Sequence, residues 1–215
     1  MKKMLGVLAL GLTFGLCVHA ADTPQADLFV GYSFVRYNSA QEVPAFTANG
    51  GISTFAWNFN GFLGLEAELG GYHNGNINNH EFDTTTFSYL FGPRGSFNRG
   101  GTLVPYVHSL FGGQNAHTSI CCVYPTTGVG QPASPGSRVA YDQNNFAMAV
   151  GGGLDIKLHK HIMLRPIQLD YLLTRFQAPT FNPNLIPPLT GESRNRNQNN
   201  LRYAAGVAFN FGGAQ

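Results

Sequence analysis

The chain has 215 residues, enough for one domain. Charged residues make up only 11% of it, against about 25% in ordinary soluble domains, whereas aromatic residues reach 13% and the mean hydropathy is near zero. So little charge excludes a typical water-exposed surface, and nothing in the charge balance suggests the basic face that a nucleic-acid partner would need.

The N-terminus has the pattern of a cleaved signal peptide. Lys2 and Lys3 precede a short apolar run that ends at Leu16, and Ala20 closes the segment. We expect cleavage after residues 1–20, which leaves 21–215 as the mature domain. A membrane anchor is the alternative, but the apolar run is shorter than the roughly 20 residues that a span needs. Cleavage removes two of the 13 basic side chains and leaves 11, equal to the 11 acidic ones.

The rest of the chain predicts an all-β fold, an eight-stranded antiparallel up-and-down transmembrane β-barrel. Such a barrel alternates lipid-facing and lumen-facing residues and therefore averages to neutral hydropathy. In chain order, the predicted strands cover residues 27–38, 50–60, 62–73, 82–95, 102–113, 145–157, 161–176 and 199–212. Most alternate with period two: Phe55, Trp57 and Phe59 share one face of the second strand, and small or polar residues share the other.

The connections between these strands are alternately short and long. Asn60-Gly61 is a type I′ hairpin signal, and the connections at 97–100 and 159–160 are also short. The others are longer and polar, above all 114–144 and 177–198. Short turns at one end and long loops at the other are typical of the periplasmic and extracellular ends of an outer-membrane barrel.

The fifth and seventh strands are harder to orient. In the fifth, Tyr106 shares a face with His108, which we expect to point inward. In the seventh, Arg165 is out of phase with Gln168. Since Pro166 cannot donate to a ladder, we predict a bulge there that resets the phase.

Two kinds of barrel fit this alternation. A soluble lipocalin-like barrel buries bulky apolar residues, and a membrane barrel exposes them to lipid. The membrane barrel is favoured because small and ionic side chains fill a narrow eight-stranded interior well. Unpaired buried charges are very costly, so we expect a salt-bridge network that plugs the lumen, with an ion gate as the alternative. The predicted network contains Glu66, Glu68, Arg94, His108, Asp155, Arg165, Asp170 and Arg202.

Five segments together resemble the OmpA-type small outer-membrane β-barrel family. They are Leu28-Phe29-Val30-Gly31-Tyr32-Ser33-Phe34, residues 64–71, Phe91-Gly92-Pro93-Arg94, residues 151–155 and Val207-Ala208-Phe209-Asn210-Phe211. The resemblance implies a barrel in the bacterial outer membrane with periplasmic N- and C-termini, whose terminal strand is read by the barrel-assembly machinery. Many relatives carry a peptidoglycan-binding domain after the barrel, and we expect none here.

Cys121 and Cys122 lie in the longest predicted loop and are candidates for a loop disulfide. A vicinal disulfide, pairing between molecules and reduced thiols all stay open. We expect no metal site, because zinc would need further ligands at suitable spacing. No cofactor motif occurs, so we expect no cofactor.

His117 and Ser119 have the His-x-Ser spacing that resembles outer-membrane lipid A deacylases. They fall in a predicted loop, however, and no acidic residue follows before Asp142. We therefore expect no enzyme.

The leading hypothesis is a structural or surface-exposed barrel in contact with outer-membrane lipid and lipopolysaccharide. A narrow ion or small-solute pore is the second hypothesis, and an outer-membrane lipid hydrolase is the third. Arg194 and Arg196 could meet lipopolysaccharide phosphates. The sequence names no ligand for the extracellular loops.

Overall fold

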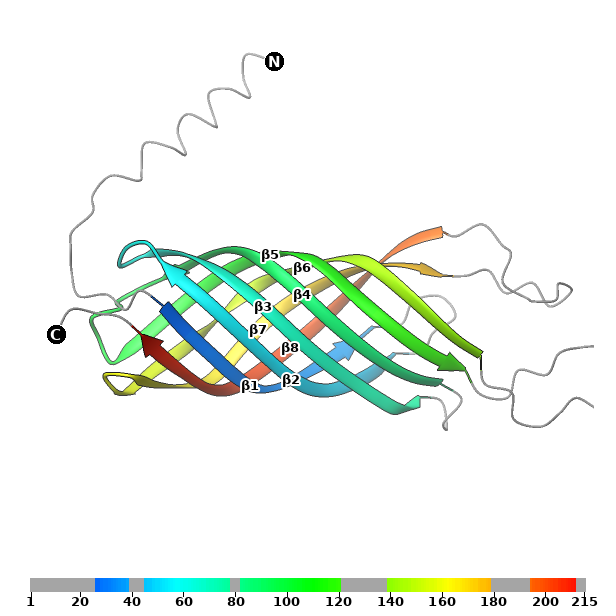
Figure 1. The fold of residues 1–215 in the computed structure, drawn as a ribbon, viewed down its shortest axis with the longest axis horizontal. Coiled ribbons are helices and arrows are strands. Elements are labelled where there is room, and N and C mark those ends of the chain that lie inside the picture. Colours follow the sequence, from blue (N-terminus) through cyan, green and yellow to red (C-terminus); the bar gives the residue numbers. More distant parts are fainter. Residues whose placement is uncertain (1–25, 39–44, 78–81, 121–138, 179–193, 212–215) are drawn as a thin grey trace, which may run out of the picture.

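The computed structural model describes residues 26–38, 45–77, 82–120, 139–178 and 194–211, which form a closed antiparallel barrel (Figure 1). The strands are β1 (Ala26–Tyr37), β2 (Phe46–Asn58), β3 (Leu63–Ile77), β4 (Phe82–Ser96), β5 (Leu103–Ile120), β6 (Val139–His159), β7 (Ile162–Ala178) and β8 (Arg194–Phe211). Each strand pairs with the next in sequence and β8 pairs with β1, so the sheet has no open edge. The predicted eight-stranded up-and-down barrel is confirmed. No helix in the described part of the chain is long and apolar enough to cross a membrane.

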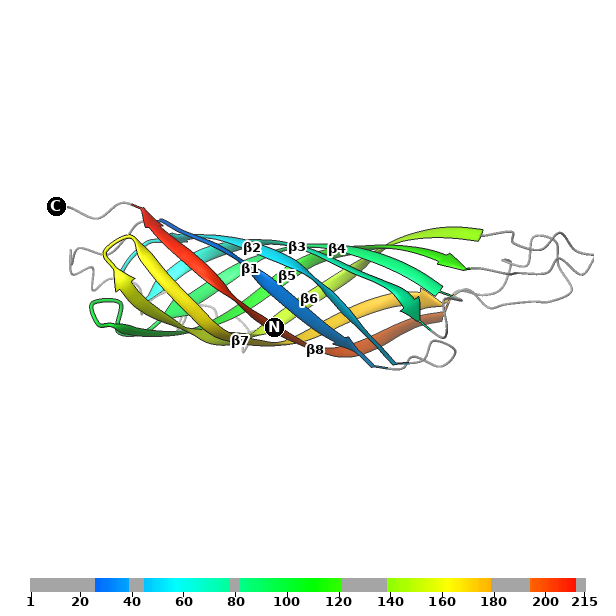
Figure 2. The ribbon, with the colours of Figure 1, turned by 90° about the horizontal axis from the view of Figure 1, so that it is seen from below.

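Tight connections gather at the end of the barrel where β1 begins and β8 ends (Figures 1 and 2). They span residues 59–62, 97–102 and 160–161. The type I′ turn predicted at Asn60-Gly61 is wrong, because that turn needs positive φ at both central residues. Among the described non-glycine residues only Asn98 has a positive φ, of 55°. Asn60 instead accepts hydrogen bonds on its side-chain oxygen from the backbone N–H groups of Phe62 and Leu63, at 2.8 and 2.7 Å.

At the opposite end the strands run further than the sequence predicts. β5 continues to Ile120 and pairs there with Val139 of β6, so the predicted loop over 114–144 is wrong at both of its ends. β7 and β8 likewise extend to Ala178 and from Arg194. In the extension of β5, polar side chains occur on both faces, such as Gln114 inside and His117 outside. The hydrophobic period therefore disappears while the backbone ladder continues.

Burial in this barrel is reversed relative to a soluble one. Trp57 and Phe87 point outward and are 47% and 48% exposed, whereas Glu68 and Asp170 are each only 1% exposed. The predicted inward and outward faces are confirmed. An exterior of large apolar side chains would be unfavourable in water.

The predicted bulge in the seventh strand is also confirmed. The register between β7 and β8 shifts between Arg165 and Gln168, around Pro166. The shift brings both polar side chains into the lumen, where each is fully buried. Without it, one of the two would face outward among apolar neighbours.

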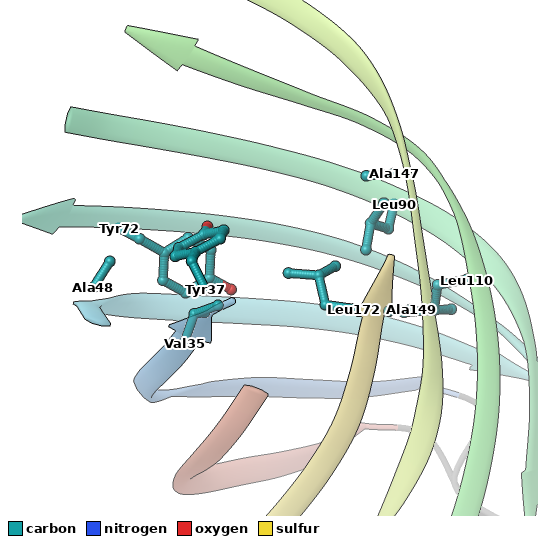
Figure 3. Packing of buried hydrophobic residues seen from close by; sticks show 9 residues of the cluster. All are labelled: Val35, Tyr37, Ala48, Tyr72, Leu90, Leu110, Ala147, Ala149 and Leu172. Carbon is teal, nitrogen blue, oxygen red and sulfur yellow. The ribbon is translucent and has the colours of Figure 1, made fainter. Parts of the chain in front are cut away.

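An apolar layer fills the lumen toward the long-loop ends of the strands (Figure 3). It consists of Val35, Tyr37, Ala48, Tyr72, Leu90, Leu110, Ala147, Ala149 and Leu172. The Tyr37 hydroxyl shares a hydrogen bond of 3.2 Å with Thr86 and accepts one of 2.8 Å from Gln114. This layer packs the barrel interior above the polar part of the lumen.

The apolar layer should contribute measurably to stability. Leu110 is fully buried, so Leu110→Ala should lower the free energy of unfolding by about 2–5 kcal/mol through lost packing and a new cavity. Urea titration of the refolded protein measures the loss. Val150→Ala, at a side chain 43% exposed on the outer face, is the control and should cost clearly less. Equal losses in the two variants would contradict a packed interior.

Candidate functional site

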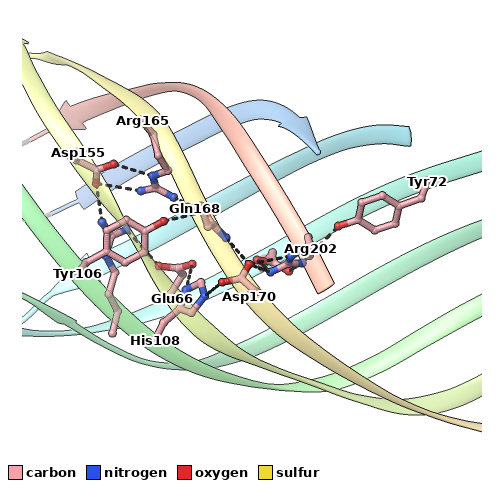
Figure 4. Close-up of polar contacts among 11 residues, drawn as sticks. Glu66, Tyr72, Tyr106, His108, Asp155, Arg165, Gln168, Asp170 and Arg202 are labelled. Atoms are coloured by element: carbon pink, nitrogen blue, oxygen red, sulfur yellow. Dashed lines mark hydrogen bonds and ion pairs between the residues drawn. The ribbon is translucent and has the colours of Figure 1, made fainter. Parts of the chain in front are cut away.

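All eight side chains of the predicted network lie in the lumen and are at most 4% exposed (Figure 4). They come from six consecutive strands, β3 to β8. In space they form one continuous chain of ion pairs, which we call the ion chain. Its order is Arg165, Asp155, Arg94, Glu66, His108, Asp170, Arg202 and Glu68.

The half of the ion chain nearer the tight turns is built by two arginines and two carboxylates. Arg165 Nε donates to Asp155 Oδ1 at 2.6 Å, and Arg94 Nη2 donates to Asp155 Oδ2 at 2.8 Å. Arg94 Nη1 then donates to Glu66 Oε2 at 3.2 Å. Asp155 therefore pairs with two arginines, and Glu66 pairs with Arg94 and with His108 of the other half. Each buried carboxylate thus has two cationic partners, as a buried charge requires.

His108 links the two halves. Its Nδ1 lies 3.1 Å from Glu66 Oε1, and its Nε2 lies 2.8 Å from Asp170 Oδ1. Both ring nitrogens face ionised acceptors, so both must donate, which only the imidazolium form can do. On β6, Gly151 faces this point, since a Cβ there would overlap the Asp170 carboxylate.

The other half of the ion chain centres on Arg202. Its Nε donates to Asp170 Oδ2 at 2.8 Å, and its Nη2 donates to Glu68 Oε2 at 2.7 Å. Its Nη1 donates to the other oxygen of Glu68. With His108 as imidazolium, four cationic groups alternate with four carboxylates, and the ion chain is neutral.

Several uncharged side chains that complete the ion chain were not predicted. Gln168 Oε1 accepts from Tyr106 at 2.7 Å and from Arg165 at 3.0 Å, and Gln168 Nε2 donates to Asp170 at 2.8 Å. The Tyr106 ring lies between two guanidinium groups, 4.0 Å from that of Arg94 and 4.4 Å from that of Arg165. In the sequence, the shared inward face of Tyr106 and His108 was the signal that could have placed Tyr106 beside the ion chain. No sequence pattern indicated the cation–π contacts.

A separate contact closes the lumen at the tight-turn end. Arg99, in the turn between β4 and β5, folds back and donates to Asp27 at 2.5 Å, and Asn58 donates to the same carboxylate oxygen at 3.0 Å. The Lys157 ammonium donates to the backbone carbonyl of Arg99. Burial lowers the pKa of the Arg99 guanidinium, and the neighbouring Asp27 opposes that shift. We call this group the turn-end latch.

The remaining sequence candidates lie elsewhere. Cys121 and Cys122 are outside the described residues, and the side chains of Arg194 and Arg196 are not described. No group of three or more His, Cys, Asp or Glu residues within the described ranges is suited to a metal ion.

The predicted loop position of His117 and Ser119 is wrong, since both belong to β5. Asp142 pairs with His117 across β5 and β6, and its Oδ1 lies 2.7 Å from His117 Nδ1. The structure gives no hydrogen bond between Ser119 and His117, and the His117–Asp142 pair is exposed. A polar extension of the sheet therefore explains these residues.

Taken together, the lumen is closed in layers. The apolar layer, the ion chain and the turn-end latch follow one another from the long-loop end to the tight-turn end. Chemically, this arrangement satisfies buried charges and fills space. None of the ion-chain carboxylates is left to act as an open ion-binding group.

Comparison with solved structures shows the same fold in several small barrels. The attachment invasion locus protein Ail of Yersinia pestis superposes with a TM-score of 0.54 at 14% identity, over 88% of this chain and 99% of that one. Neisserial surface protein A gives 0.55 at 11% identity, over 87% and 97% of the two chains. OprG of Pseudomonas aeruginosa gives 0.55 at 12% identity, over 91% and 99%. No protein-family model and no curated protein sequence matches the chain.

The ion chain should behave as a set of mutually dependent charges. Arg202→Met leaves Glu68 and Asp170 facing an apolar side chain, and should lower the free energy of unfolding by about 3–5 kcal/mol. Adding Glu68→Gln should recover at least half of that loss, because Asp170 keeps His108 and Gln168 as partners. Urea titrations in lipid vesicles measure both variants.

The control is Lys160→Met, which removes an exposed charge in a tight turn and should change stability by no more than about 0.5 kcal/mol. Additive losses from the Arg202 and Glu68 substitutions would show that the two charges do not depend on each other.

Proposed function

We propose that this protein spans a bacterial outer membrane as a plugged eight-stranded barrel with a structural or surface-exposed role. The reversed burial carries the proposal: apolar side chains cover the outside, and the ionic ones are neutralised within. A lipid environment is the solvent in which this distribution is stable. OprG, one of the barrels with this fold, is described as an outer membrane protein.

The outer surface supports a membrane position, because aromatic side chains bound its apolar band on both sides. On the long-loop side, tyrosine hydroxyls donate to asparagine side chains, on the adjacent strand for Tyr32 and Tyr171 and across β5 to β6 for Tyr89. These pairs are Tyr32–Asn49 at 2.6 Å, Tyr89–Asn144 at 3.0 Å and Tyr171–Asn199 at 2.6 Å. On the tight-turn side, the exposed aromatic residues are Trp57, Phe59, Phe97 and Phe211. Aromatic girdles of this kind mark the two membrane interfaces of such barrels.

The strand length between the two girdles also fits. In β2, residues 49–57 cover the band, a run of nine, and a tilted transmembrane strand needs about 9–11. The tight turns then belong in the periplasm together with both termini, and the polar strand extensions project from the cell. From the sequence pattern we also propose OmpA-type membership and signal-peptide cleavage after Ala20. From the proposed position in the outer membrane we propose assembly by the barrel-assembly machinery and contact with lipopolysaccharide.

For the lumen, we favour a structural plug over a pore. The ion chain uses its carboxylates internally, the apolar layer lies above it, and the turn-end latch lies below. We propose no catalytic role, because Ser119 lacks a hydrogen bond to His117 and the barrels of similar fold supply no activity to transfer.

The membrane position can be tested by adding a charge to the apolar band. Val107 is 52% exposed near the middle of the band, so Val107→Lys should destabilise the barrel in vesicles by about 2–4 kcal/mol. Thr102→Lys, in an exposed tight turn, should have little effect. The unmodified protein should fractionate with the outer membrane and change its gel migration on heating. A periplasmic protein without a heat shift would contradict the proposal.

The plug is tested by planar-bilayer recording of the unmodified protein. We expect no resolved single-channel steps, since the apolar layer, the ion chain and the turn-end latch occupy the lumen of the described barrel. Robust steps that Glu68→Gln abolishes would contradict the plug and favour the narrow pore.

A further inference from the structure

Two exposed arginines stand directly above the tyrosine girdle on one side of the barrel. On β1, Arg36 follows Tyr32 by four residues on the same outer face. On β7, Arg175 follows Tyr171 by the same interval. Both strands run toward the long-loop end, so both guanidinium groups lie at the level where the apolar band gives way to polar side chains.

The pairing of the strands places these arginines on either side of β8. β8 lies between β1 and β7, so the two flanking strands are about 10 Å apart. Arg36 pairs in register with Leu201 of β8, and Arg175 pairs with Asn197, so the two positions are also offset by four residues, about 13 Å along the strand. Asn199 lies between these two positions on the same outer face of β8. Two flexible guanidinium arms can therefore converge on one group above Asn199.

In the described part of the chain, no acidic side chain forms an ion pair with these arginines. The opposite side of the barrel carries acidic side chains at its long-loop end: there Asp83 lies 3.6 Å from His73, and Asp142 lies 2.7 Å from His117. Positive charge is thus concentrated on the β7–β8–β1 side.

Asn199 adds neutral donors to this patch. Its side-chain oxygen accepts the hydroxyl of Tyr171 at 2.6 Å, which leaves the amide N–H groups of the side chain for another acceptor. Directly below, Leu201 is 56% exposed and continues the apolar band. The patch therefore combines cationic and amide donors with an adjoining surface suited to acyl chains.

We propose that Arg36, Arg175 and Asn199 bind a phosphate group of lipid A in the outer leaflet. The inference rests on the membrane position proposed above. Guanidinium groups recognise phosphate through paired charge-assisted hydrogen bonds. A lipid-borne phosphate is favoured over a soluble anion because the patch lies on the outside of the barrel, against its apolar band. The lipid headgroup would sit above Tyr171, and its chains would pack below on Leu201.

The test measures lipid A binding to the full chain, folded in zwitterionic detergent micelles, by native mass spectrometry. Bisphosphorylated lipid A should bind the unmodified protein, and Arg36→Gln or Arg175→Gln should each weaken binding about tenfold. Lys160→Gln removes one exposed positive charge at the tight-turn end and should leave the affinity unchanged. Dephosphorylated lipid A should bind the unmodified protein about as weakly as lipid A binds the variants.

Unchanged affinity in both arginine variants would overturn the site, as would an equal loss in Lys160→Gln. If inorganic phosphate displaced lipid A completely and bound with the same affinity, the proposal that the phosphate belongs to a lipid would be wrong. Heat-modifiable migration of the unmodified protein is recorded in parallel. If it is present and the two forms of lipid A bind equally, only the phosphate site fails. If it is absent, the membrane position fails as well.

Discussion

A narrow closed lumen allows no charge to stand without a partner, and this constraint organises the barrel. Every ionic side chain of the ion chain meets a group of opposite sign on a neighbouring or facing strand, and His108 joins the two halves as a donor on both ring nitrogens. Because charged, polar and small residues occupy most of the interior, most of the large apolar side chains lie outside. In water, the same distribution would expose a large apolar surface. The polar interior is therefore compatible with an exterior that contacts lipid.

The sequence was sufficient for most of this arrangement, because period-two alternation separates the two faces wherever one face is apolar and the other is not. It also located the bulge, since Pro166 stands where Arg165 and Gln168 fall out of phase. The strand ends were missed where polar residues occupy both faces, as around His117, because there the alternation carries no signal. The turn-end latch was missed for a different reason. Arg99 and Asp27 are 72 residues apart in sequence and become neighbours only when the barrel closes.

Two groups of charges therefore have different roles. Those in the lumen form ion pairs with one another, which supports a structural plug, although Arg94 Nε is buried without a hydrogen-bond partner. Those on the polar collar, such as Arg36 and Arg175, lie outside the lumen and next to the apolar band. Binding of lipid headgroups should depend on Arg36 and Arg175, and the free energy of unfolding should depend on the ion chain. Substitutions in the two groups can then be separated by their effects.

The most direct measurement uses the single tryptophan of the chain, Trp57, which points outward at the tight-turn end of the band and is 47% exposed. The unmodified protein is refolded into vesicles whose acyl chains carry bromine, a contact quencher of indole fluorescence. The reversed-burial account predicts strong quenching by the brominated lipid and weak quenching by aqueous acrylamide. Fluorescence that is insensitive to brominated lipid but quenched by acrylamide would contradict it, because Trp57 would then lie in water and not against lipid.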